Sequence, residues 1–427
     1  MLRTLISVVL FSLMFSSNET EELPIGFTPE EWENRDVIRA WGNRTDPPPA
    51  PVRNIAEYEP MQGVLIRYPF GISTSVIREM AEDITVYCLV SSSQQNSAYN
   101  SMNSAGVEMD NVEFILGSTD SYWTRDYGPW WVVDGNGDYA IVDFTYNRPR
   151  PNDNQAPHKV SEYLDIPYYS ADFISAGGNY MTDGFGVSAS TQIAYTENDE
   201  CNTNDQSSIP LPPCAYINDI MDEYYGIETY HVVADPNNEY IDHIDCWGKF
   251  LSPNRLLIRE VPISHSQYDE IEDVVDYFQS VPASDGISWE IFRVYTPNDQ
   301  PYTNSLILNN KVFVPIMNSS WDDEALEAYQ IAMPNHEILG FTGSWQSTDA
   351  LHCRAKGIPD TSYSPFDNGD VNMDESIDIL DVVLLVNFVL GADYPDSTQE
   401  ALSDLNDDGI VNILDIISLI NVILGGV

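Results

Sequence analysis

Apolar residues gather in short runs along most of the chain, and longer amphipathic stretches separate these runs. The runs typical of buried strands are 64–68, 85–90, 112–116, 130–133, 140–144, 256–260, 305–308 and 312–316. Residues 76–84, 265–280 and 323–333 instead repeat their apolar positions with helical spacing. The alternation predicts an α/β fold, and periodicity alone leaves open a parallel sheet or a propeller of small sheets.

A short acidic stretch between two of the strand-like runs has a superficial likeness to a calcium loop. It reads Asp134-Gly-Asn-Gly-Asp138, and the position where such a loop needs its last carboxylate holds Thr145. Because strand-like runs flank the stretch directly, it is better interpreted as a hairpin turn.

The N-terminal region differs in composition from the rest of the chain. Arg3, an apolar run over 5–15 and two serines at 16–17 are typical of a secretory signal, which predicts export and its removal after residue 17. Residues 18–52 are polar and end in a Pro-rich stretch, so we expect an extended arm. No later stretch is long and apolar enough to predict a membrane span, and the mature protein is expected to be secreted and soluble.

Charge divides the rest of the chain into two parts. The formal net charge is -49, which argues against nucleic acid as a partner and favours a cationic ligand or calcium. Beyond Lys356 there is no Lys or Arg, while residues 362–427 hold 13 acidic residues. We therefore expect a catalytic domain over 53–358, a linker over 359–366 and a separate acidic domain over 367–427.

The acidic domain is a repeat with a period of 34 residues, and each copy runs from an acidic loop into an apolar helix. Oxygen-bearing residues occupy the loop positions 1, 3, 5, 9 and 12 that hold calcium in EF-hand-like sites. They are Asp370, Asn372, Asp374, Asp378 and Asp381 in the first copy, and Asp404, Asn406, Asp408, Asn412 and Asp415 in the second. The alternative is a pair of acidic, N-capped helices without metal.

This duplicated loop-helix unit resembles a type I dockerin. The resemblance implies an all-α domain that folds with calcium and docks onto a cohesin-like partner. Positions 10 and 11, which are usually hydroxylic or charged in dockerins, are Ile379-Leu380 and Ile413-Leu414 here. An ordinary cellulosomal partner is therefore not expected.

Five cysteines are few for a disulfide scaffold, so the core must supply most of the stability. Cys201 and Cys214 bracket a polar, Pro-rich loop and are the plausible bridge, although connectivity cannot be deduced from sequence. Cys88 lies in a strand-like run and is expected to be a buried apolar residue.

A cysteine and a histidine carry the first candidate chemistry. Cys353 is close in sequence to His352, Arg354 and Lys356, and such cationic surroundings would favour a reactive thiolate, although most lone cysteines are buried and inert. If residues 240–247 are extended, His243 and Asp245 project from one face, as an acid/base pair would. A structural His–Asp pair is the alternative.

Two further segments carry charges suited to ligands. Asp126 lies among aromatic residues before a Gly-Pro turn, which suits a carboxylate that holds a planar cation, or else a solvated turn. Arg148 and Arg150 alternate with prolines and predict an anion site, with surface ion pairs as the alternative.

Together these residues resemble the Porphyromonas-type peptidyl-arginine deiminase and agmatine deiminase family over residues 50–360. The resemblance is carried by Trp-Thr-Arg-Asp-Tyr-Gly-Pro at 123–129, Gly-Gly-Asn at 177–179, His-Ile-Asp at 243–245 and the late cysteine. It implies a five-bladed ββαβ propeller, the pentein fold, with the site at its axis. It further implies a nucleophile Cys353, an acid/base His243, guanidinium carboxylates Asp126 and Asp245, and a supporting Asn304.

The resemblance also suggests the reaction and the substrate. It implies attack of the thiolate on a guanidinium carbon and hydrolysis of a thiouronium to citrulline, without a cofactor. Ala176 replaces the Glu typical of agmatine deiminases, whereas 146–151 resemble the peptidyl branch, in which two arginines hold the carboxylate of a C-terminal arginine. Agmatine or free arginine as substrate and a non-catalytic binding module stay open. In the peptidyl branch, the residues expected around the substrate are Arg148, Arg150, Trp123, Tyr240, Ile241 and Thr348.

Overall fold

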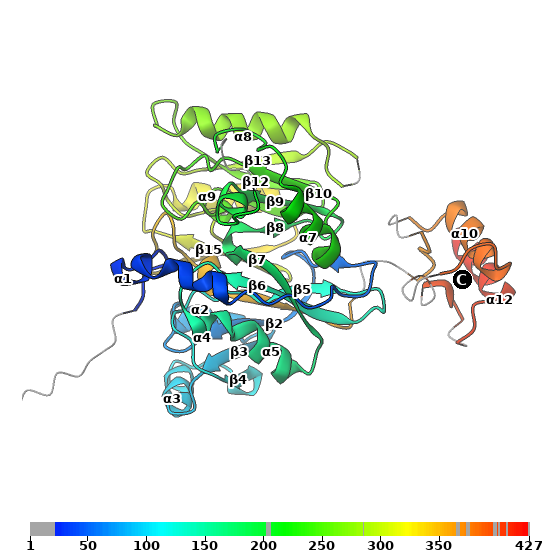
Figure 1. Cartoon of the computed structure of the whole chain (residues 1–427), viewed down its shortest axis with the longest axis horizontal. Helices are drawn as coiled ribbons and strands as arrows, with labels where there is room; N and C mark the ends of the chain where they lie inside the picture. Colours follow the sequence, from blue (N-terminus) through cyan, green and yellow to red (C-terminus); the bar gives the residue numbers. More distant parts are fainter. Residues whose placement is uncertain are drawn as a thin grey trace, which may run out of the picture.

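The computed structural model describes residues 22–201, 206–284, 286–363, 368–372, 376–395, 399, 402–406 and 409–425 (Figure 1). The expected signal at 1–17, the calcium positions Asp374 and Asp408, and part of the expected linker lie outside these residues. Two bodies are visible: a large one of strands and helices, and a small helical one formed by the C-terminal residues.

Within the described residues, the strands form five separate small sheets and no single closed sheet. One sheet contains β17 (Lys356–Pro359), β2 (Met61–Arg67), β3 (Thr85–Val90) and β4 (Val112–Leu116). Another contains β1 (Arg53–Asn54), β5 (Trp130–Val133), β6 (Tyr139–Tyr146) and β7 (Tyr168–Ser175). The others are β8 (Met181–Thr182), β9 (Val187–Thr191) and β10 (Thr229–Val233); β11 (Gly248–Ser252), β12 (Arg255–Glu260) and β13 (Glu290–Tyr295); and β14 (Leu306–Leu308), β15 (Lys311–Ile316) and β16 (Glu337–Thr342).

Every sheet contains an antiparallel pair followed by a parallel pair, as in β11–β12 and β12–β13. A parallel pair needs a crossover, and a helix supplies it in each sheet. These helices are α2 (Thr74–Met80), α5 (Ala156–Leu164), α7 (Ala215–Tyr225), α8 (Tyr268–Ser280) and α9 (Asp322–Ala332). The unit is therefore ββαβ, and β17 from the end of the domain completes the sheet that β2 begins.

The crossover helices bury one face each against their sheets. In α8 the buried residues are Ile271, Val274, Val275 and Phe278, which follow the spacing of one helical face. They pack with the strand residues Leu256 and Ile258 in one apolar cluster. Each such side chain contributes about 1.5–3 kcal/mol by leaving water, so the amphipathic pattern in the sequence fixes which face of the helix meets the sheet.

Several local predictions are confirmed. The stretch 134–138 joins the antiparallel strands β5 and β6 as a hairpin turn. Cys201 and Cys214 form a disulfide, and Cys88 is fully buried in the core. The shorter helical segments of the domain are α3 (Gln95–Ser104), η2 (Met109–Asn111), α4 (Pro151–Asn154), η3 (Gly177–Asn179), α6 (Ile193–Thr196), η4 (Ile244–Cys246) and η5 (His352–Arg354).

Two local predictions are wrong. Residues 244–246 form the 3₁₀ helix η4 and not an extended segment, so His243 and Asp245 are not brought together by strand alternation. The N-terminal arm is not simply extended either. It contains α1 (Pro29–Glu33) and the 3₁₀ helix η1 (Arg35–Ala40), because Thr28 and Glu31 form a capping box that starts a helix.

The C-terminal body contains α10 (Ile379–Val389) and α12 (Ile413–Ile423), which share a small apolar core around Val371, Leu385 and Leu419. Equivalent residues of the two repeats cap these helices, namely Asp378 and Asn412. The repeat in the sequence therefore corresponds to a repeat in structure. Among the helices of the described ranges, none is long and apolar enough to cross a bilayer.

Candidate active site

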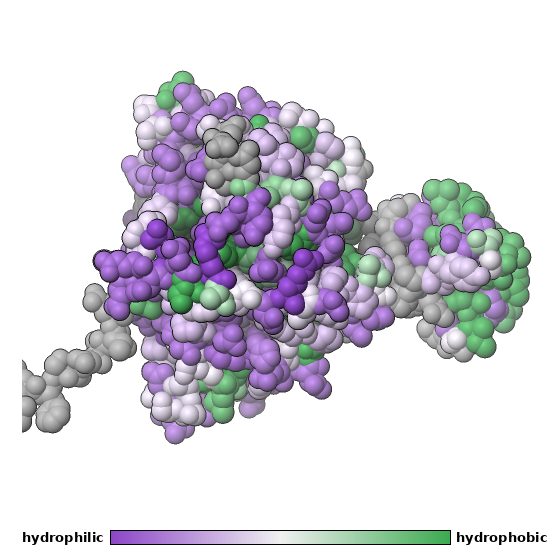
Figure 2. All heavy atoms as spheres, viewed as in Figure 1, coloured by the Kyte–Doolittle hydropathy of each residue, from purple (hydrophilic) through white to green (hydrophobic). Residues whose placement is uncertain are grey.

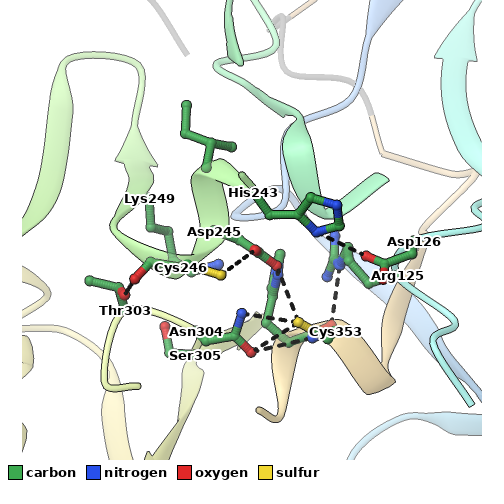
Figure 3. Close-up of polar contacts among 12 residues, drawn as sticks. Arg125, Asp126, His243, Asp245, Cys246, Lys249, Thr303, Asn304, Ser305 and Cys353 are labelled. Atoms are coloured by element: carbon green, nitrogen blue, oxygen red, sulfur yellow. Dashed lines mark hydrogen bonds and ion pairs between the residues drawn. The ribbon is translucent and has the colours of Figure 1, made fainter. Parts of the chain in front are cut away.

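Five loops, one ahead of the first strand of each ββαβ unit, bring the candidate residues together (Figure 3). Asp126 precedes β5, Asp245 precedes β11 and Asn304 precedes β14. Gly178 lies ahead of β8, and Cys353 lies ahead of β17. Residues that are far apart in sequence therefore meet because they occupy the same place in successive units.

Cys353 is fully buried and held by two of these loops. Its Sγ accepts a hydrogen bond from Asn304 Nδ2 at 3.2 Å and lies 3.7 Å from Asp245 Oδ2. Its backbone nitrogen donates to Asn304 Oδ1 at 3.4 Å, and its carbonyl accepts from the backbone of Arg125 at 3.2 Å. The thiol thus has a fixed position beside a carboxylate, and the fold brings Cys353, Asp245 and Asn304 together.

His243 and Asp126 face each other, and both have polar atoms without a hydrogen-bond partner among the described residues. His243 Nδ1 lies 3.6 Å from Asp126 Oδ1, too far for a hydrogen bond. Both ring nitrogens of His243 and Oδ1 of Asp126 are buried without a hydrogen-bond partner among the described residues. Since unpaired buried polar atoms are costly, the arrangement suits a polar ligand that would pair with them.

Gly178 allows the polar groups of the site to approach the backbone closely. A Cβ atom at this position would be 2.6 Å from Asp126 Oδ1, 2.7 Å from His243 Nδ1 and 3.2 Å from Asp245 Oδ2. Any side chain would therefore displace the groups of the site. The Gly-Gly-Asn motif was recognised in the sequence, but no role was assigned to this glycine. The feature that could have indicated its role is the pair of adjacent glycines between strand-like segments.

Asn179, the last residue of that motif, links its own loop by hydrogen bonding to the loop that carries His243 and Asp245. Its Oδ1 accepts hydrogen bonds from the backbone nitrogens of Ile244 at 3.2 Å and Thr191 at 3.0 Å. Ile244 lies between His243 and Asp245, so Asn179 fixes the turn that carries both. It is a positioning residue, which the sequence did not assign.

The two carboxylates titrate in opposite directions. Burial and then the neighbouring Asp245 charge raise the pKa of Asp126 well above its ordinary value. Burial would also raise the pKa of Asp245, but the hydrogen bond and charge of His352 outweigh burial and lower it. Asp245 is therefore the more readily ionised of the two carboxylates, and a nearby cation would favour the charged form of Asp126.

The expected cationic surroundings of Cys353 are not found. Burial, followed by the charges of Asp245 and Asp126, raises the pKa of Cys353 well above its ordinary value. Arg354 is paired with Asp349 at 2.5 Å, and the Lys356 Nζ lies 3.4 Å from the centre of the Trp130 ring. The neighbours in sequence are thus turned to other partners, and in the free protein the thiol is protonated.

His243 is also neutral in the free protein, because burial lowers the pKa of its imidazole to about 4. A neutral imidazole can accept the proton of a thiol, and a neutral thiol can supply one. The free site therefore holds a neutral thiol and a neutral imidazole, and a cation between the carboxylates would favour the thiolate.

The comparisons with known proteins agree with this geometry. A family model described as Porphyromonas-type peptidyl-arginine deiminase matches residues 53–359, more than half of the chain. The chain belongs to this family. The enzyme is thus a deiminase, a hydrolase of C–N bonds in amidines. A second model, the type I dockerin domain, matches residues 368–424.

Individual relatives are distant in sequence but similar in fold. Agmatine deiminase of Medicago truncatula is 24% identical over 333 residues, which covers 65% of this chain and 84% of the relative. The solved agmatine deiminase of Enterococcus faecalis has a TM-score of 0.61 at 18% identity and covers 80% of this chain and 100% of that one. A C. jejuni agmatine deiminase has a TM-score of 0.59 at 19% identity, over 72% of this chain and 96% of that one. The fold is the pentein fold of these deiminases.

Next to Cys353, the deiminase holds a buried charged network. His352 Nδ1 lies 2.6 Å from Asp245 Oδ2, and its Nε2 lies 2.6 Å from Glu57 Oε2. Two ionised carboxylates favour a ring that donates from both nitrogens, whereas burial opposes this by lowering the pKa of His352. Lys249 at 2.8 Å and Arg125 at 2.7 Å balance the charge of Glu57. His352 thus positions Asp245, a role that the sequence did not assign.

The residues expected around the substrate lie near the site of the deiminase. Trp123 and Ile241 are buried in one apolar cluster with Cys353. The hydroxyl of Tyr240 is 3.4 Å from Thr348 Oγ1. Arg148 and Arg150 are also buried, so they do not form the surface ion pairs that were the alternative prediction. Both arginines contact the N-terminal arm.

In the dockerin match, the carboxylates at loop position 12 are fully buried: Asp381 and Asp415. Asp381 Oδ1 accepts from the backbone of Asn372, and Asp415 Oδ1 has no hydrogen-bond partner among the described residues. A buried carboxylate oxygen without a partner fits a calcium ligand. Within the described ranges, however, no three His, Cys, Asp or Glu side chains form a group able to hold a metal ion.

Proposed function

We propose that the enzyme converts the guanidinium of arginine at the C-terminus of peptides to citrulline and ammonia. The observation that supports this reaction is the buried set of Cys353, His243, Asp126 and Asp245, with unpaired polar atoms of His243 and Asp126 close to Gly178. A guanidinium offers five N–H donors in one plane, and two carboxylates with a histidine offer matching acceptors.

In the first half of the reaction, the guanidinium lies between Asp126 and Asp245, whose charges keep it protonated and electrophilic. Its positive charge favours the thiolate of Cys353, and His243 accepts the thiol proton as sulfur bonds to the central carbon. His243 returns that proton to one amino group, the C–N bond breaks, and ammonia leaves. A thiouronium joined to Cys353 remains.

In the second half, water takes the place of the ammonia. His243 accepts a proton from the water as its oxygen bonds to the same carbon. The C–S bond then breaks, the thiol recovers its proton, and the carbon carries the oxygen of a citrulline ureido group. The sum is guanidinium plus water giving citrulline plus ammonium, with no cofactor in any step.

The two arginines beside the site indicate the substrate class. Arg148 and Arg150 are both buried beside the apolar residues that line Cys353. A free carboxylate at the far end of the substrate would pair with them, whereas the amine at the far end of agmatine would be repelled. Amidation of the peptide would remove the charge that they hold. Agmatine remains the second candidate, because relatives such as the Medicago truncatula protein are agmatine deiminases.

Replacing Arg148 with alanine should therefore affect substrates unequally. We expect kcat/KM for a peptide ending in free arginine to fall about 10- to 100-fold, since a hydrogen bond to a charged group is worth about 1.5–3 kcal/mol. The amidated peptide should lose little. Citrulline formation with both peptides and with agmatine is the measurement, and the ratio between the two peptides is the quantity compared.

Arg39→Ala is the control for this variant, because its side chain is exposed and pairs with Asp199 on the surface. It should leave the ratio unchanged. Equal losses on both peptides in Arg148→Ala would contradict the role of the arginine, and faster turnover of agmatine than of either peptide would move the substrate to the small amine.

Two further features of the catalytic domain and its export belong to the same proposal. The five sheets are the blades of one ββαβ propeller around the site; each blade contributes one loop to it, and a crystal structure would test this arrangement.

Residues 1–17 are a signal that is removed on export, since they combine Arg3 with an apolar run, and N-terminal sequencing of the exported protein would test the cleavage.

The C-terminal domain is proposed to bind two calcium ions and a cohesin-like protein. Asp370, Asn372, Asp374, Asp378 and Asp381 would hold one ion, and Asp404, Asn406, Asp408, Asn412 and Asp415 the other. The repeated pairs Ile379-Leu380 and Ile413-Leu414 are more than half exposed, and Figure 2 shows apolar residues over much of this body. The partner should therefore present an apolar face.

Removal of calcium should unfold this domain and spare the other. Without the ions, the buried carboxylates Asp381 and Asp415 repel or must protonate, so helices α10 and α12 lose their support. We expect chelation to reduce the helical circular dichroism and to remove one thermal transition, both restored by calcium and not by an equal concentration of magnesium. Citrulline formation should stay unchanged; a transition insensitive to chelation would contradict the proposed sites.

A further inference from the structure

The N-terminal arm lies over the candidate active site. In Figure 1 α1 lies at the left edge of the large body and the chain after it runs across that body, although the domain that holds the site begins only at β1. Cys353, His243, Asp126 and Asp245 are at most 3% exposed. Part of the cover over these residues comes from residues 22–31, which belong to the arm and not to the ββαβ units.

Ile25 of the arm packs in the apolar cluster that contains Cys353. It is 3% exposed and packs in one cluster with Trp123, Ile241, Cys246 and Cys353. Gly26 follows against the ring of Tyr240, where a Cβ atom would lie 2.7 Å from a ring carbon. The residues expected to surround the carbon chain of a substrate arginine therefore surround Ile25 instead.

The two arginines of the site hold the backbone of the same segment. Arg148 Nε donates to the carbonyl of Ile25 at 3.0 Å. Arg150 Nη2 donates to the carbonyls of Pro24 at 2.6 Å and Gly26 at 2.9 Å. The oxygens of the arm are thus placed where the proposed function puts the carboxylate of the substrate.

A carboxylate of the arm completes the contact. Glu31 Oε1 accepts from Arg150 Nε at 2.7 Å, and Glu31 Oε2 accepts from Nη2 at 3.1 Å, a two-point pair that is mostly buried. The capping box with Thr28 fixes this glutamate at the start of α1. Glu22, at the other end of the segment, pairs with Arg67 at 2.6 Å.

We propose that residues 22–31 are an autoinhibitory segment that occupies the substrate site and must leave before a peptide can bind. The proposal rests on the proposed function, since it takes Arg148 and Arg150 as the binding groups for the substrate. An attached segment competes at the effective concentration of an intramolecular ligand, about millimolar for a short linker. Proteolysis or a partner that pulls the arm away would then activate the enzyme.

The test loosens the arm in the full chain without changing the site. Ile25→Ser removes the apolar contact, and Glu31→Gln removes the charge that pairs with Arg150. Glu30→Gln is the matched control, since this side chain is exposed and lies one residue earlier. We compare alkylation of Cys353 by iodoacetamide at one pH, followed by mass spectrometry of the peptide that carries it. Cys88 is the internal control, because it is buried in a different core.

We expect alkylation of Cys353 to be about 10-fold faster or more in Ile25→Ser and faster in Glu31→Gln, with no change in Glu30→Gln or at Cys88. A synthetic peptide of residues 22–31 should slow it again in Ile25→Ser. A thermal unfolding curve equal to that of the parent shows that the arm, and not the domain, has opened. Unchanged alkylation in both arm variants would overturn the proposal.

Turnover separates this proposal from the one on which it rests. If the arm inhibits, KM for the C-terminal arginine peptide should fall several-fold in Ile25→Ser, while kcat stays nearly the same. Faster alkylation without turnover of any guanidinium substrate would support the arm and reject the proposed function. Turnover with KM and alkylation equal to those of the parent would support the function and reject the arm.

Discussion

Replacement of Cys353 with alanine should reduce citrulline formation by at least about 10³-fold, because no other group can form the covalent intermediate. Its Sγ is held by Asn304 and lies 3.7 Å from Asp245 Oδ2, so no neighbouring thiol can replace it. Cys246, the nearest other thiol in the cluster, is directed to Asp245 Oδ1 at 3.7 Å. Residual turnover would come from binding and charge alone.

The measurement is single-turnover release of ammonia with the C-terminal arginine peptide, with Cys88→Ala as the matched control. Cys88 is buried in the core of the β2–β3 sheet, and its loss should change stability but not turnover of the folded enzyme. The alanine variant should still bind the peptide. Turnover within tenfold of the parent would mean that a residue other than Cys353 attacks the guanidinium.

The second large effect is expected from Asp245→Asn, which keeps the shape of the side chain and removes its charge. The substitution takes away a carboxylate that is proposed to face the guanidinium, and it leaves the His352 ring without one of its two carboxylate partners. Breaking a buried ion pair costs about 3–5 kcal/mol, of which we expect at least about 3 kcal/mol to appear in kcat/KM, a loss of about 10²-fold or more.

The matched control is Asp242→Asn, three residues earlier in the same loop and outside the group that faces Cys353. Steady-state kinetics on the C-terminal arginine peptide should show Asp242→Asn close to the parent and Asp245→Asn impaired in both kcat and KM. Losses of equal size in the two variants would indicate that the loop was disturbed, and would contradict a direct role for Asp245.

Much of the fold could be predicted because its signals are local. The acidic turn at 134–138 connects β5 and β6, and the stripe of Ile271, Val274 and Phe278 fixes the buried face of α8. The 34-residue repeat also appears as two capped helices. Each of these depends on neighbours within one or two turns of chain, so residue order is sufficient.

The candidate site was predicted less completely, because its chemistry depends on distant contacts. Nearness in sequence suggested that Arg354 and Lys356 would activate Cys353, but folding turns them to Asp349 and Trp130. A glycine is needed at 178 because three side chains of two other loops lie where its Cβ atom would be. The link from Glu57 to His352 spans 295 residues, and no pattern along the chain marks it.

Residue order alone was enough for the alternation of strands and helices, the duplicated acidic domain and the residue types available for chemistry. Which charges face each other was settled by the three-dimensional fold, since pKa values and ion pairs depend on distance through space and on burial. The fold places carboxylates around Cys353 and turns Arg354 and Lys356 to other partners, which raises the pKa of a thiol that the sequence had suggested would ionise. It also placed the arm on Arg148 and Arg150, because the chain ahead of the domain folds back over the site.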